Sequence, residues 1–582
     1  MSRFYCEDSR RLTGANLYSS LPGAVLDLKL RDTAESDDNS VYDLELFHKM
    51  WERHVLALLA ALSWEHQSTF HRFYDKGVSL GFTAPIDCLY SATELNEFAL
   101  TLTAKELELG LISGTEVEKI SSFDDVVSHL RKRIKEEENP TLLDIQLAAE
   151  NHDVVFLYDD DIVSVGLGAD CHQWSIEHLP NPDNIPWNKT SSIPLALITG
   201  TNGKSTSVRL AASISKAAGL NTGLTSTDYI KVGDEIIDEG DYSGPGGART
   251  LLRDKRVEVA LLEVARGGLL RRGLGVPEAD AVLITNVAAD HLGDYGINNV
   301  ADLIEAKFIV HKALQPCSPL ILNADDVGVV EYVSSLKQNI IWFAESINNN
   351  VIRQHLESDG EVVTLIEKKV VHIKNGIQTP IIDIAEVPIT LNGMAPHNVQ
   401  NTLGVVALSC SMGIDYKHIK QGLLNFSGAV DENPGRGNYF EARGIKILID
   451  FAHNEHGMKA LASTVSNIHS KRSLILLGQA GDRSDDAIVD LVNAAMTIKP
   501  DKMIVSETPG YERGREAQEV SNIIAAAIKT NNFPEKGIWH TKNPVDGVKR
   551  ALDWAVSGDF LLFIVLTSRN EVLEIVKDFV RE

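Results

Sequence analysis

From residue 192 onward, short apolar segments alternate with amphipathic segments along the chain. The apolar segments have the length of strands, whereas the amphipathic ones repeat their apolar residues at helical spacing. The segment Ser205–Ala218 shows this spacing in Val208, Leu210, Ala211, Ile214 and Ala217. Strands that alternate with helices are typical of βαβ units, so the pattern predicts a mainly parallel sheet.

The first 190 residues follow a different pattern. Ala24–Leu30 alternates like a strand, and Asp32–Asn39 is polar enough to predict a loop. Phe47–Leu62, Leu95–Leu109 and Phe123–Glu138 are predicted helices, the first with its apolar residues on one side. We therefore expect an α+β arrangement in this part of the chain.

Two segments predict linkers. Asn181–Ser192 is rich in proline, and Gly428–Gly437 carries glycine and proline. A chain of 582 residues is also too long for a single core. We predict an α/β protein with an N-terminal α+β domain (1–190), a central P-loop domain with a mainly parallel sheet (191–430) and a C-terminal doubly wound, Rossmann-like α/β domain (431–582).

Composition and charge exclude several classes of function. A net charge of −26 argues against a surface for nucleic acid or for anionic lipid. The five cysteines form no closely spaced pair, which favours a reducing compartment and predicts neither a disulfide framework nor a cysteine metal site. The N-terminus lacks a signal-peptide pattern, and the apolar runs are too short to cross a membrane. We expect a cytoplasmic protein that binds neither nucleic acid nor membrane.

The clearest chemical motif is a glycine loop between an apolar strand and a helix. The strand is Leu195–Thr199, and the loop is Gly200, Thr201, Asn202, Gly203, Lys204, Ser205 and Thr206. Backbone N–H groups and the helix dipole attract phosphate at such a place. Lys204 would supply charge to the β- and γ-phosphates, and the Ser205 hydroxyl is placed to ligate Mg²⁺. The general P-loop pattern has a glycine where Ile198 stands, so a plain glycine turn is the alternative.

Two further strands carry polar residues near their ends. Val257–Val264 contains Glu263, and Ala281–Asn286 is followed by Asp290 and His291. Ligands of open α/β sheets bind beyond the carboxyl ends of the strands, so these residues should lie near the glycine loop. Glu263 can then act on Mg²⁺ as a Walker B carboxylate does, directly or through water. A capping or packed histidine is the alternative to a metal role for His291.

Taken together, these residues resemble the Mur ligases, a family that includes the peptidoglycan-precursor ligases and folylpolyglutamate synthetase. The elements that carry the resemblance occur in the family's order, namely the glycine loop, Glu263, Thr285-Asn286, Asp290-His291, His397-Asn398 with Asn401, Arg436 and Asp450–Asn454. Mur ligases use a shorter form of the glycine loop, which explains Ile198.

Within this family, the chain is most similar to the Mur-like half of the cyanophycin synthetases. The segments that carry this likeness are Leu262–Gly273, Asn286–Gly293, Glu432–Arg436, Gly481–Arg483 and, near the N-terminus, Gly14–Tyr18. Cyanophycin synthetases have an ATP-grasp domain between their N-terminal domain and the Mur half, and the residues before Gly200 leave no room for both. We therefore expect the ATP-grasp step to be absent.

The resemblance implies an acid–amino-acid ligase that uses ATP and Mg²⁺ and releases ADP and phosphate. An amino acid, Arg or Lys, would be joined to a carboxylate of an acidic or aspartyl peptide through an acyl phosphate. The partners implied are these small molecules, and a homo-oligomer is left open. The alternatives are a nucleotide-binding, non-catalytic paralogue that regulates or scaffolds a related synthetase, and a simple P-loop ATPase or kinase.

The resemblance also implies a role for each site residue. Catalysis would involve Lys204, Glu263, His291 and Lys307, the last at a position where several Mur ligases carry a carbamylated lysine. The nucleotide would be bound by Gly200 to Thr206, Asn286, His397, Asn398, Asn401, Arg436 and Asp450. The metal would be held by Ser205, Glu263 and His291. Substrates would meet Arg266, Arg271, Arg272, His453 and Asn454. A plain surface lysine is the alternative for Lys307, and ordinary ion pairs are the alternative for the three arginines.

Overall fold

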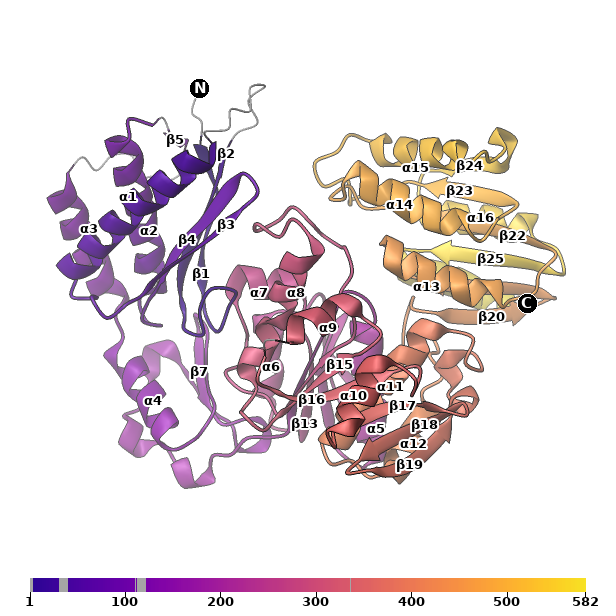
Figure 1. The fold of residues 1–582 in the computed structure, drawn as a ribbon, viewed down its shortest axis with the longest axis horizontal. Helices are drawn as coiled ribbons and strands as arrows, with labels where there is room; N and C mark the ends of the chain where they lie inside the picture. Colours follow the sequence, from indigo (N-terminus) through magenta and orange to yellow (C-terminus); the bar gives the residue numbers. More distant parts are fainter. Residues whose placement is uncertain (1–3, 31–39, 110, 113–121, 335, 582) are drawn as a thin grey trace.

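The computed structural model describes residues 4–30, 40–109, 111–112, 122–334 and 336–581. Figure 1 shows an N-terminal part in indigo, a central part in magenta and a C-terminal part in orange and yellow, with the central part between the other two. The loop predicted over Asp32–Asn39 lies outside the described residues.

The N-terminal part begins with a five-stranded sheet that carries helices on one face (Figure 1). The strand order is β3-β4-β2-β1-β5. The strands are β1 (Phe4–Leu12), β2 (Gly23–Leu30), β3 (Thr69–Tyr74), β4 (Gly77–Thr83) and β5 (Leu111–Ile112). The helices are α1 (Ser40–Ala61), α2 (Leu89–Glu106) and α3 (Phe123–Glu137), which confirm the predicted helices.

A smaller layer connects this sheet to the central part. It consists of α4 (Pro140–Asn151) and a three-stranded antiparallel sheet of β6 (Phe156–Tyr158), β7 (Ile162–Val165) and β8 (His172–Ser175). The α+β character predicted for the N-terminal part is therefore confirmed.

The central part is built on one large sheet with the order β12-β11-β10-β13-β9-β14-β15-β16-β17-β18-β19. The strands from β10 to β17 in this order run parallel. Their bounds are β9 (Leu195–Thr199), β10 (Thr222–Thr225), β13 (Val259–Glu263), β14 (Ala281–Ile284), β15 (Pro319–Asn323), β16 (Asn339–Ala344) and β17 (Glu361–Ile366). The mainly parallel sheet is thus confirmed.

Antiparallel strands extend this sheet at both edges. They are β11 (Tyr229–Val232) and β12 (Glu235–Glu239) at one edge, and β18 (Lys369–Lys374) and β19 (Ile377–Asp383) at the other. The second edge continues the parallel part directly, because β17 pairs with β16 and β18 pairs with β17.

Helices cover both faces of the central sheet. One face packs against α5 (Lys204–Ala217), α11 (Pro396–Ser411) and α12 (Tyr416–Asn425). The other packs against α6 (Pro245–Leu252), α7 (Arg266–Arg272), α8 (Val300–Phe308), α9 (Val327–Val333) and α10 (Asn350–Glu357). The apolar stripe predicted for α5 explains why this helix packs against the sheet. Its residues Val208, Leu210, Ala211 and Ile214 are buried in the core.

The C-terminal part has the strand order β20-β21-β25-β22-β23-β24, with only β20 antiparallel to its neighbour. The strands are β20 (Asn438–Ala442), β21 (Ile445–Asp450), β22 (Arg472–Leu477), β23 (Lys502–Ser506), β24 (Ile538–Thr541) and β25 (Asp559–Ile564). One face packs against α13 (Glu455–Ser466), α14 (Asp485–Met496) and α15 (Glu519–Thr530), the other against α16 (Pro544–Trp554) and α17 (Arg569–Arg581). The doubly wound arrangement is confirmed.

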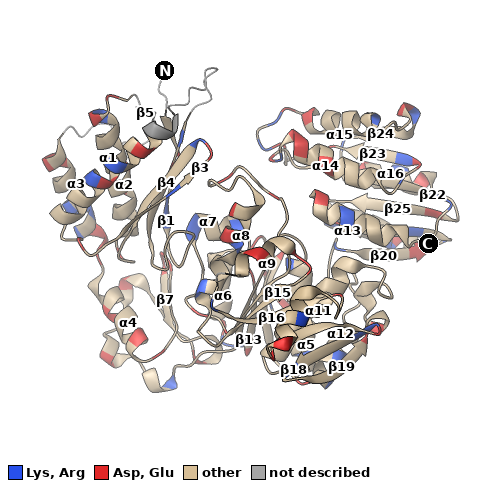
Figure 2. Ribbon diagram, in the orientation of Figure 1, with Lys and Arg blue, Asp and Glu red and all other residues tan. Residues whose placement is uncertain are grey.

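Strands β8 and β9 belong to different sheets, and so do strands β19 and β20. We propose that residues 190 and 430 separate independently folding domains. Acidic and basic residues are spread over the helices of all three parts (Figure 2). Throughout the part of the chain that the structure describes, every helix is too short or too polar to span a bilayer.

A buried ion pair joins the N-terminal sheet to the central part. Arg10 on β1 and Asp27 on β2 approach to 2.5 Å, and their side chains are 3% and 0% exposed. Arg10 Nε also donates to the carbonyl of Leu270 on α7 at 3.0 Å, and Ser79 Oγ donates to Asp27 at 2.6 Å. The pair therefore fixes the N-terminal sheet against a helix of the central part.

Replacement of Arg10 by methionine should destabilise the N-terminal part strongly. Because Arg10→Met leaves Asp27 charged and buried without its guanidinium, we expect the free energy of unfolding to fall by about 3–5 kcal/mol. Arg11→Met is the matched control, since Arg11 pairs with Asp160, whose side chain is 59% exposed, and should cost less than about 1 kcal/mol. Urea denaturation measures both. Equal losses in the two variants would contradict the buried pair's role.

Candidate active site

The glycine loop lies at the carboxyl end of β9, which runs between β13 and β14. Glu263 pairs in register with Ile198, and Ile284 pairs with Thr199, so the ends of the three strands are level. Gly203 has φ +86°, and a Cβ there would come within 2.2 Å of Asn401 Oδ1. Glycine is therefore required where α11 crosses the loop.

A cavity of about 2040 Å³ lies over these strand ends, with walls from all three parts of the chain. Every site residue predicted from the sequence lines it except Gly200 and Asn454. Gly200 lies beneath the wall, and its carbonyl accepts a hydrogen bond from Lys307 Nζ at 2.7 Å. Asn454 forms two reciprocal amide hydrogen bonds with Asn202, at 3.1 and 3.2 Å, which join the C-terminal part to the loop.

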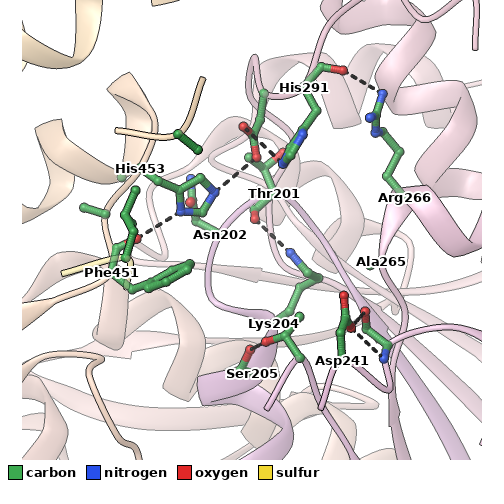
Figure 3. Close-up of a pocket in the computed structure, with 18 of the residues that line it drawn as sticks. Thr201, Asn202, Lys204, Ser205, Asp241, Ala265, Arg266, His291, Phe451 and His453 are labelled. Atoms are coloured by element: carbon green, nitrogen blue, oxygen red, sulfur yellow. Dashed lines mark hydrogen bonds and ion pairs between the residues drawn. The ribbon is translucent and has the colours of Figure 1, made fainter. Parts of the chain in front are cut away.

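Lys204 and Ser205 stand between the two sides of this cavity (Figure 3). Phe451 and His453 come from the C-terminal part, whereas Ala265 comes from the central part. Lys204 Nζ donates to the Thr201 carbonyl of its own loop at 3.0 Å. The lysine ammonium therefore sits beside the backbone groups that are predicted to bind phosphate.

The arrangement around Glu263 fits a divalent cation. Glu263 is 2% exposed, and its Oε1 is buried without a hydrogen-bond partner among the described residues. Its Oε2 accepts from the backbone N–H of Thr227 at 3.3 Å, and Thr227 Oγ1 lies 3.3 Å from Ser205 Oγ. A buried carboxylate oxygen without a partner is costly, and Mg²⁺ beside Ser205 would satisfy it.

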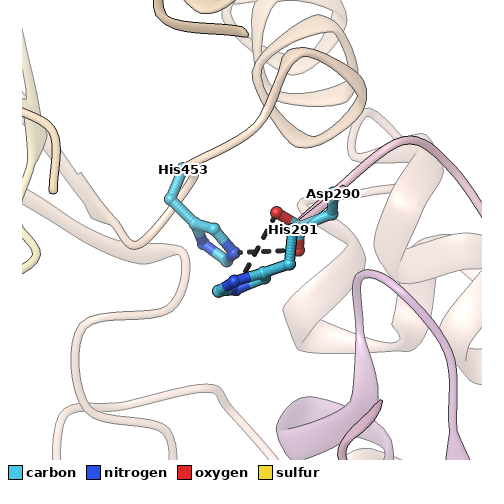
Figure 4. Close-up of side chains that lie close together, drawn as sticks. All are labelled: Asp290, His291 and His453. Carbon is cyan, nitrogen blue, oxygen red and sulfur yellow. Dashed lines mark ion pairs between the residues drawn. The ribbon is translucent and has the colours of Figure 1, made fainter. Parts of the chain in front are cut away.

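His291 belongs to a cluster with Asp290 and His453 (Figure 4), whose possible ligand atoms all lie within 4.8 Å of one another. The two ring nitrogens of His291 lie 3.0 and 2.8 Å from Arg483 Nη1 and Nη2. Burial lowers the pKa of His291 to about 4, and the charge of Arg483 acts in the same direction. The imidazole is neutral at neutral pH, but a metal can reach it only if the Arg483 guanidinium moves.

Asp290 of the central part contacts two residues of the C-terminal part. His453 Nε2 lies 3.5 Å from Asp290 Oδ2, and Arg483 Nη2 lies 3.5 Å from Asp290 Oδ1. Burial opposes ionisation of Asp290, but the hydrogen bond of His453 and the charge of Arg483 hold its pKa below the ordinary value. The cluster therefore contains a largely buried carboxylate of the central part that faces Arg483 and His453 of the C-terminal part.

Lys307 on α8 is buried, with only 4% of the residue exposed, so the alternative of a plain surface lysine is wrong. Burial lowers the pKa of Lys307 well below the usual value, and the charge of Lys204 lowers it further. A lysine amine must be neutral to react with carbon dioxide, so this environment suits the carbamylation that the resemblance implies.

The start of α11 supplies a polar wall to the cavity. Asn401 Nδ2 donates to Asn398 Oδ1 at 3.2 Å, and Asn398 Nδ2 donates to the Ile389 carbonyl at 2.9 Å. Burial lowers the pKa of His397 to about 4, and its Nδ1 is buried without a partner among the described residues. These residues offer neutral hydrogen-bonding groups of the kind that suit a nucleotide base.

Asp450 ends β21 and faces the cavity from the C-terminal part. Burial raises its pKa to about 6, against the charge of Arg436 and the backbone N–H groups of Gly437, Ala452 and Phe451. The carboxylate can accept from two ribose hydroxyls when it is ionised. Its charge state should therefore control nucleotide binding in weakly acidic solution.

The affinity for nucleotide should fall as the pH drops through about 6, because protonation of Asp450 removes an acceptor. The folded protein binds the Asp450 proton more tightly than the unfolded chain does, because folding raises the pKa from 3.8 to about 6. The stability that results is fully present below pH 3.8 and is lost as the pH rises through about 6. Asp450→Asn should flatten the pH profile of binding and raise the unfolding midpoint at about pH 8. Calorimetric titration and thermal unfolding measure these effects. An unchanged profile in Asp450→Asn would contradict the ribose contact.

The three arginines predicted to bind substrate already have protein partners. Arg266 donates to the His291 carbonyl at 2.6 Å and pairs with Asp294 at 2.9 Å. Arg272 Nη1 donates to the carbonyl of Arg11 at 3.3 Å, and Arg271 Nε lies 3.4 Å from the Tyr295 hydroxyl. Arg271 is exposed at the cavity wall, whereas Arg266 and Arg272 are partly buried.

Sequence reasoning missed several charged residues of the cavity. Asp228, which follows β10, pairs with Arg209, Arg436 and Arg569. The rule that found Glu263, namely that functional residues follow the carboxyl ends of parallel strands, would also have found Asp228. Strand β10 (Thr222–Thr225) escaped notice because it is short and contains little apolar sequence.

Comparisons with known proteins agree with this geometry. The Mur ligase middle domain family matches residues 198–409, and the family described as Mur ligase, glutamate ligase domain matches residues 435–564. The cyanophycin synthetase of Synechocystis sp. is 34% identical over 394 residues, which are 68% of this chain and 44% of that protein. The cyanophycin synthetase of Geminocystis herdmanii is 38% identical over 352 residues, which are 60% of this chain and 39% of that protein. The match thus spans less than half the length of these relatives.

A solved structure shares the fold. The crystal structure of a bifunctional folylpolyglutamate synthase/dihydrofolate synthase with Mn, AMPPNP and L-glutamate bound is 15% identical, with a TM-score of 0.50, and the match covers 66% of this chain and 89% of that chain. The two matching domain families lie on opposite sides of the cavity and together cover more than half of the chain. The chain therefore belongs to the Mur ligase family.

Proposed function

We propose that the protein is an ATP-dependent ligase that joins an amino acid to a carboxylate of an acidic or aspartyl peptide through an acyl phosphate. The observation that carries this proposal is that Lys204 and Glu263 of the central part and Asp450 of the C-terminal part line one cavity. A nucleotide bound by both parts would lie with its phosphates at the glycine loop. The family membership supports the same class of reaction.

In the first proposed step, an oxygen of the acceptor carboxylate attacks the γ-phosphorus of ATP, and the bond to the β-phosphate oxygen breaks, so that ADP leaves. The carboxylate thereby gains a phosphate leaving group. Lys204 and Arg436 would stabilise the charge of the transferred phosphoryl group. Mg²⁺ held by Ser205 and Glu263 would add positive charge at the phosphate oxygens.

In the second proposed step, the amine nitrogen attacks the acyl carbon, phosphate leaves, and the nitrogen loses a proton to form the amide. Water would hydrolyse the same intermediate, so the site must exclude it. The contacts between the C-terminal part and the loop support this role, since Asn202 pairs with Asn454 and His453 reaches Asp290. Docking of the two parts would assemble the site and close it to solvent.

The charges along the cavity favour a basic amino acid and an acidic acceptor. The cavity continues to the N-terminal strand β1, where Glu7 and Asp8 line it, and to α7, where Arg266 and Arg271 line it. Carboxylates suit the guanidinium of a donor such as Arg or the ammonium of Lys, whereas arginines suit carboxylates of the acceptor. This mixed lining supports Arg or Lys as the amine.

The proposal is tested by incubating the purified protein with ATP, Mg²⁺, acidic peptides and a panel of amino acids, while ADP and product mass are followed. An amide product whose mass equals acceptor plus amino acid minus water is the expected result. ADP without an amide would indicate an ATPase. Tight nucleotide binding without turnover would favour the regulatory paralogue over the ligase.

A further inference from the structure

The buried carboxylate of Asp228, which lines the cavity, forms ion pairs with arginines from three separate segments. The side chain of Asp228 is 8% exposed and pairs with Arg209 of α5, with Arg569 of α17 at 2.5 Å and with Arg436 of the segment before β20 at 3.5 Å. Burial alone would raise the pKa of Asp228, but the charges of Arg436, Arg209 and Arg569 outweigh it and hold the pKa below the ordinary range. Asp228 is therefore an anion shared between the central and C-terminal parts.

The residue before it, Thr227, contacts Ser205 and Glu263, two of the three predicted magnesium ligands. Its hydroxyl lies 3.3 Å from Ser205 Oγ and accepts from Arg436 Nη2 at 3.0 Å, and its backbone N–H donates to Glu263 at 3.3 Å. The two adjacent residues thus connect Ser205 and Glu263 on one side with arginines of the C-terminal part on the other.

The segment before β20, which contains Asn433 and Arg436, is hydrogen-bonded to helix α5. Arg209 Nη1 donates to Asn433 Oδ1 at 2.9 Å, and Asn433 Nδ2 donates to Thr206 Oγ1 at 3.3 Å and to the Arg436 carbonyl at 3.0 Å. Arg209 and Thr206 belong to α5, which begins at the glycine loop. The connection between the two parts is therefore packed directly onto the helix that follows the loop.

We infer that Asp228 is a positioning residue that couples docking of the C-terminal part to the arrangement of Ser205 and Glu263, an inference that rests on the proposed ligase function. With Arg569 paired to Asp228, the segment after β10 is held so that Thr227 contacts both Ser205 and Glu263. When the C-terminal part moves away, Asp228 loses Arg569, and the contacts of Thr227 loosen. The metal site is thus complete only while the two parts are docked.

A double-mutant cycle tests this coupling. Asp228→Asn removes the charge at nearly constant shape, and Arg569→Gln removes the contact from the C-terminal part alone. We expect each variant to lower kcat about 100-fold with a much smaller change in KM for the amino acid, because breaking a buried ion pair leaves a charge without its partner. The double variant should be no slower than the slower single variant, since Asp228→Asn already removes the ion pair that Arg569→Gln breaks. Asp228→Glu should recover part of the activity.

Asp234→Asn is the matched control. Asp234 follows β11 and pairs with Lys216 of α5 at 2.6 Å, but both side chains are largely exposed. Like Asp228, it joins α5 to a loop of this sheet edge, but it does not line the cavity. The control should change kcat less than about twofold. Multiplicative losses in the double variant, or full activity in Asp228→Asn, would overturn the inference.

Small-angle X-ray scattering with the analogue AMPPNP and Mg²⁺ gives a readout that does not need turnover. Wild type and Asp234→Asn should stay compact, whereas Asp228→Asn and Arg569→Gln should show a larger radius of gyration. Compact variants would overturn the inference. Failure of the proposed function would instead appear as no amide from the wild type. If Asp228→Asn does not fold, as thermal unfolding would reveal, Arg569→Gln carries the test alone.

Discussion

Replacement of Lys204 by alanine should abolish amide formation almost completely. Lys204 Nζ lies at the glycine loop and lines the cavity, with the Thr201 carbonyl 3.0 Å away. Removal of the ammonium takes away a charge that would stabilise the transferred phosphoryl group, so we expect kcat/KM for ATP to fall by roughly 10³-fold or more. Steady-state measurement of ADP release and of product mass checks this result.

Lys216→Ala provides the control for this prediction. Lys216 lies on the same helix α5, but its side chain is 63% exposed and pairs with Asp234. The variant should keep nearly full activity and stability, because exposed ion pairs contribute about 0–1 kcal/mol. If the two lysine variants lost activity equally, the role of Lys204 in binding phosphate would be wrong.

Glu263→Gln should separate activity from stability. Glu263 has a buried carboxylate oxygen without a partner among the described residues, and a neutral amide in its place carries less desolvation cost. We expect the apparent affinity for Mg²⁺ to fall by about 10–100-fold, because a ligand is weakened. In Mg²⁺-free buffer, the free energy of unfolding should stay equal or rise. Activity titrated against Mg²⁺, together with denaturation without it, measures both effects.

Glu258→Gln is the matched change at the other end of the same strand. Glu258 precedes β13 and accepts from the backbone N–H of Asn221 at 2.7 Å, away from the cavity. Its replacement should leave the Mg²⁺ dependence unchanged. A strongly destabilised Glu263→Gln with an unchanged Mg²⁺ titration would show that Glu263 has a structural role and holds no metal.

Much of the fold was predictable because the core elements obey strong local patterns. Strand β9 and helix α5 fall where the apolar run and the helical stripe predicted them. Strands β20 and β24 were not predictable, because they lie at the edges of their sheet and have alternating exposed residues within very short segments. Their pairing with neighbouring strands, rather than their own sequence, decides their structure.

The candidate site was predictable where it follows strand ends. Glu263 and His291 came from the rule for parallel strands, and Lys204 came from the glycine loop. The partners of these residues were not predictable, because they are far apart in the sequence. Arg483 reaches His291 from the C-terminal part, and Arg569 reaches Asp228 across 341 positions. Such contacts depend on how the two parts dock, which a local pattern does not contain.

The transfer of isotope from the acceptor tests the central claim most directly. If the terminal phosphoryl group of ATP is passed to a bound acid, an acceptor labelled with ¹⁸O in its carboxylate should deliver one labelled oxygen to each phosphate released, and the amide should retain the other. Mass spectrometry of the phosphate and of the product measures both. Unlabelled phosphate would contradict the account, because it would mean that water, rather than the acid, takes the phosphoryl group.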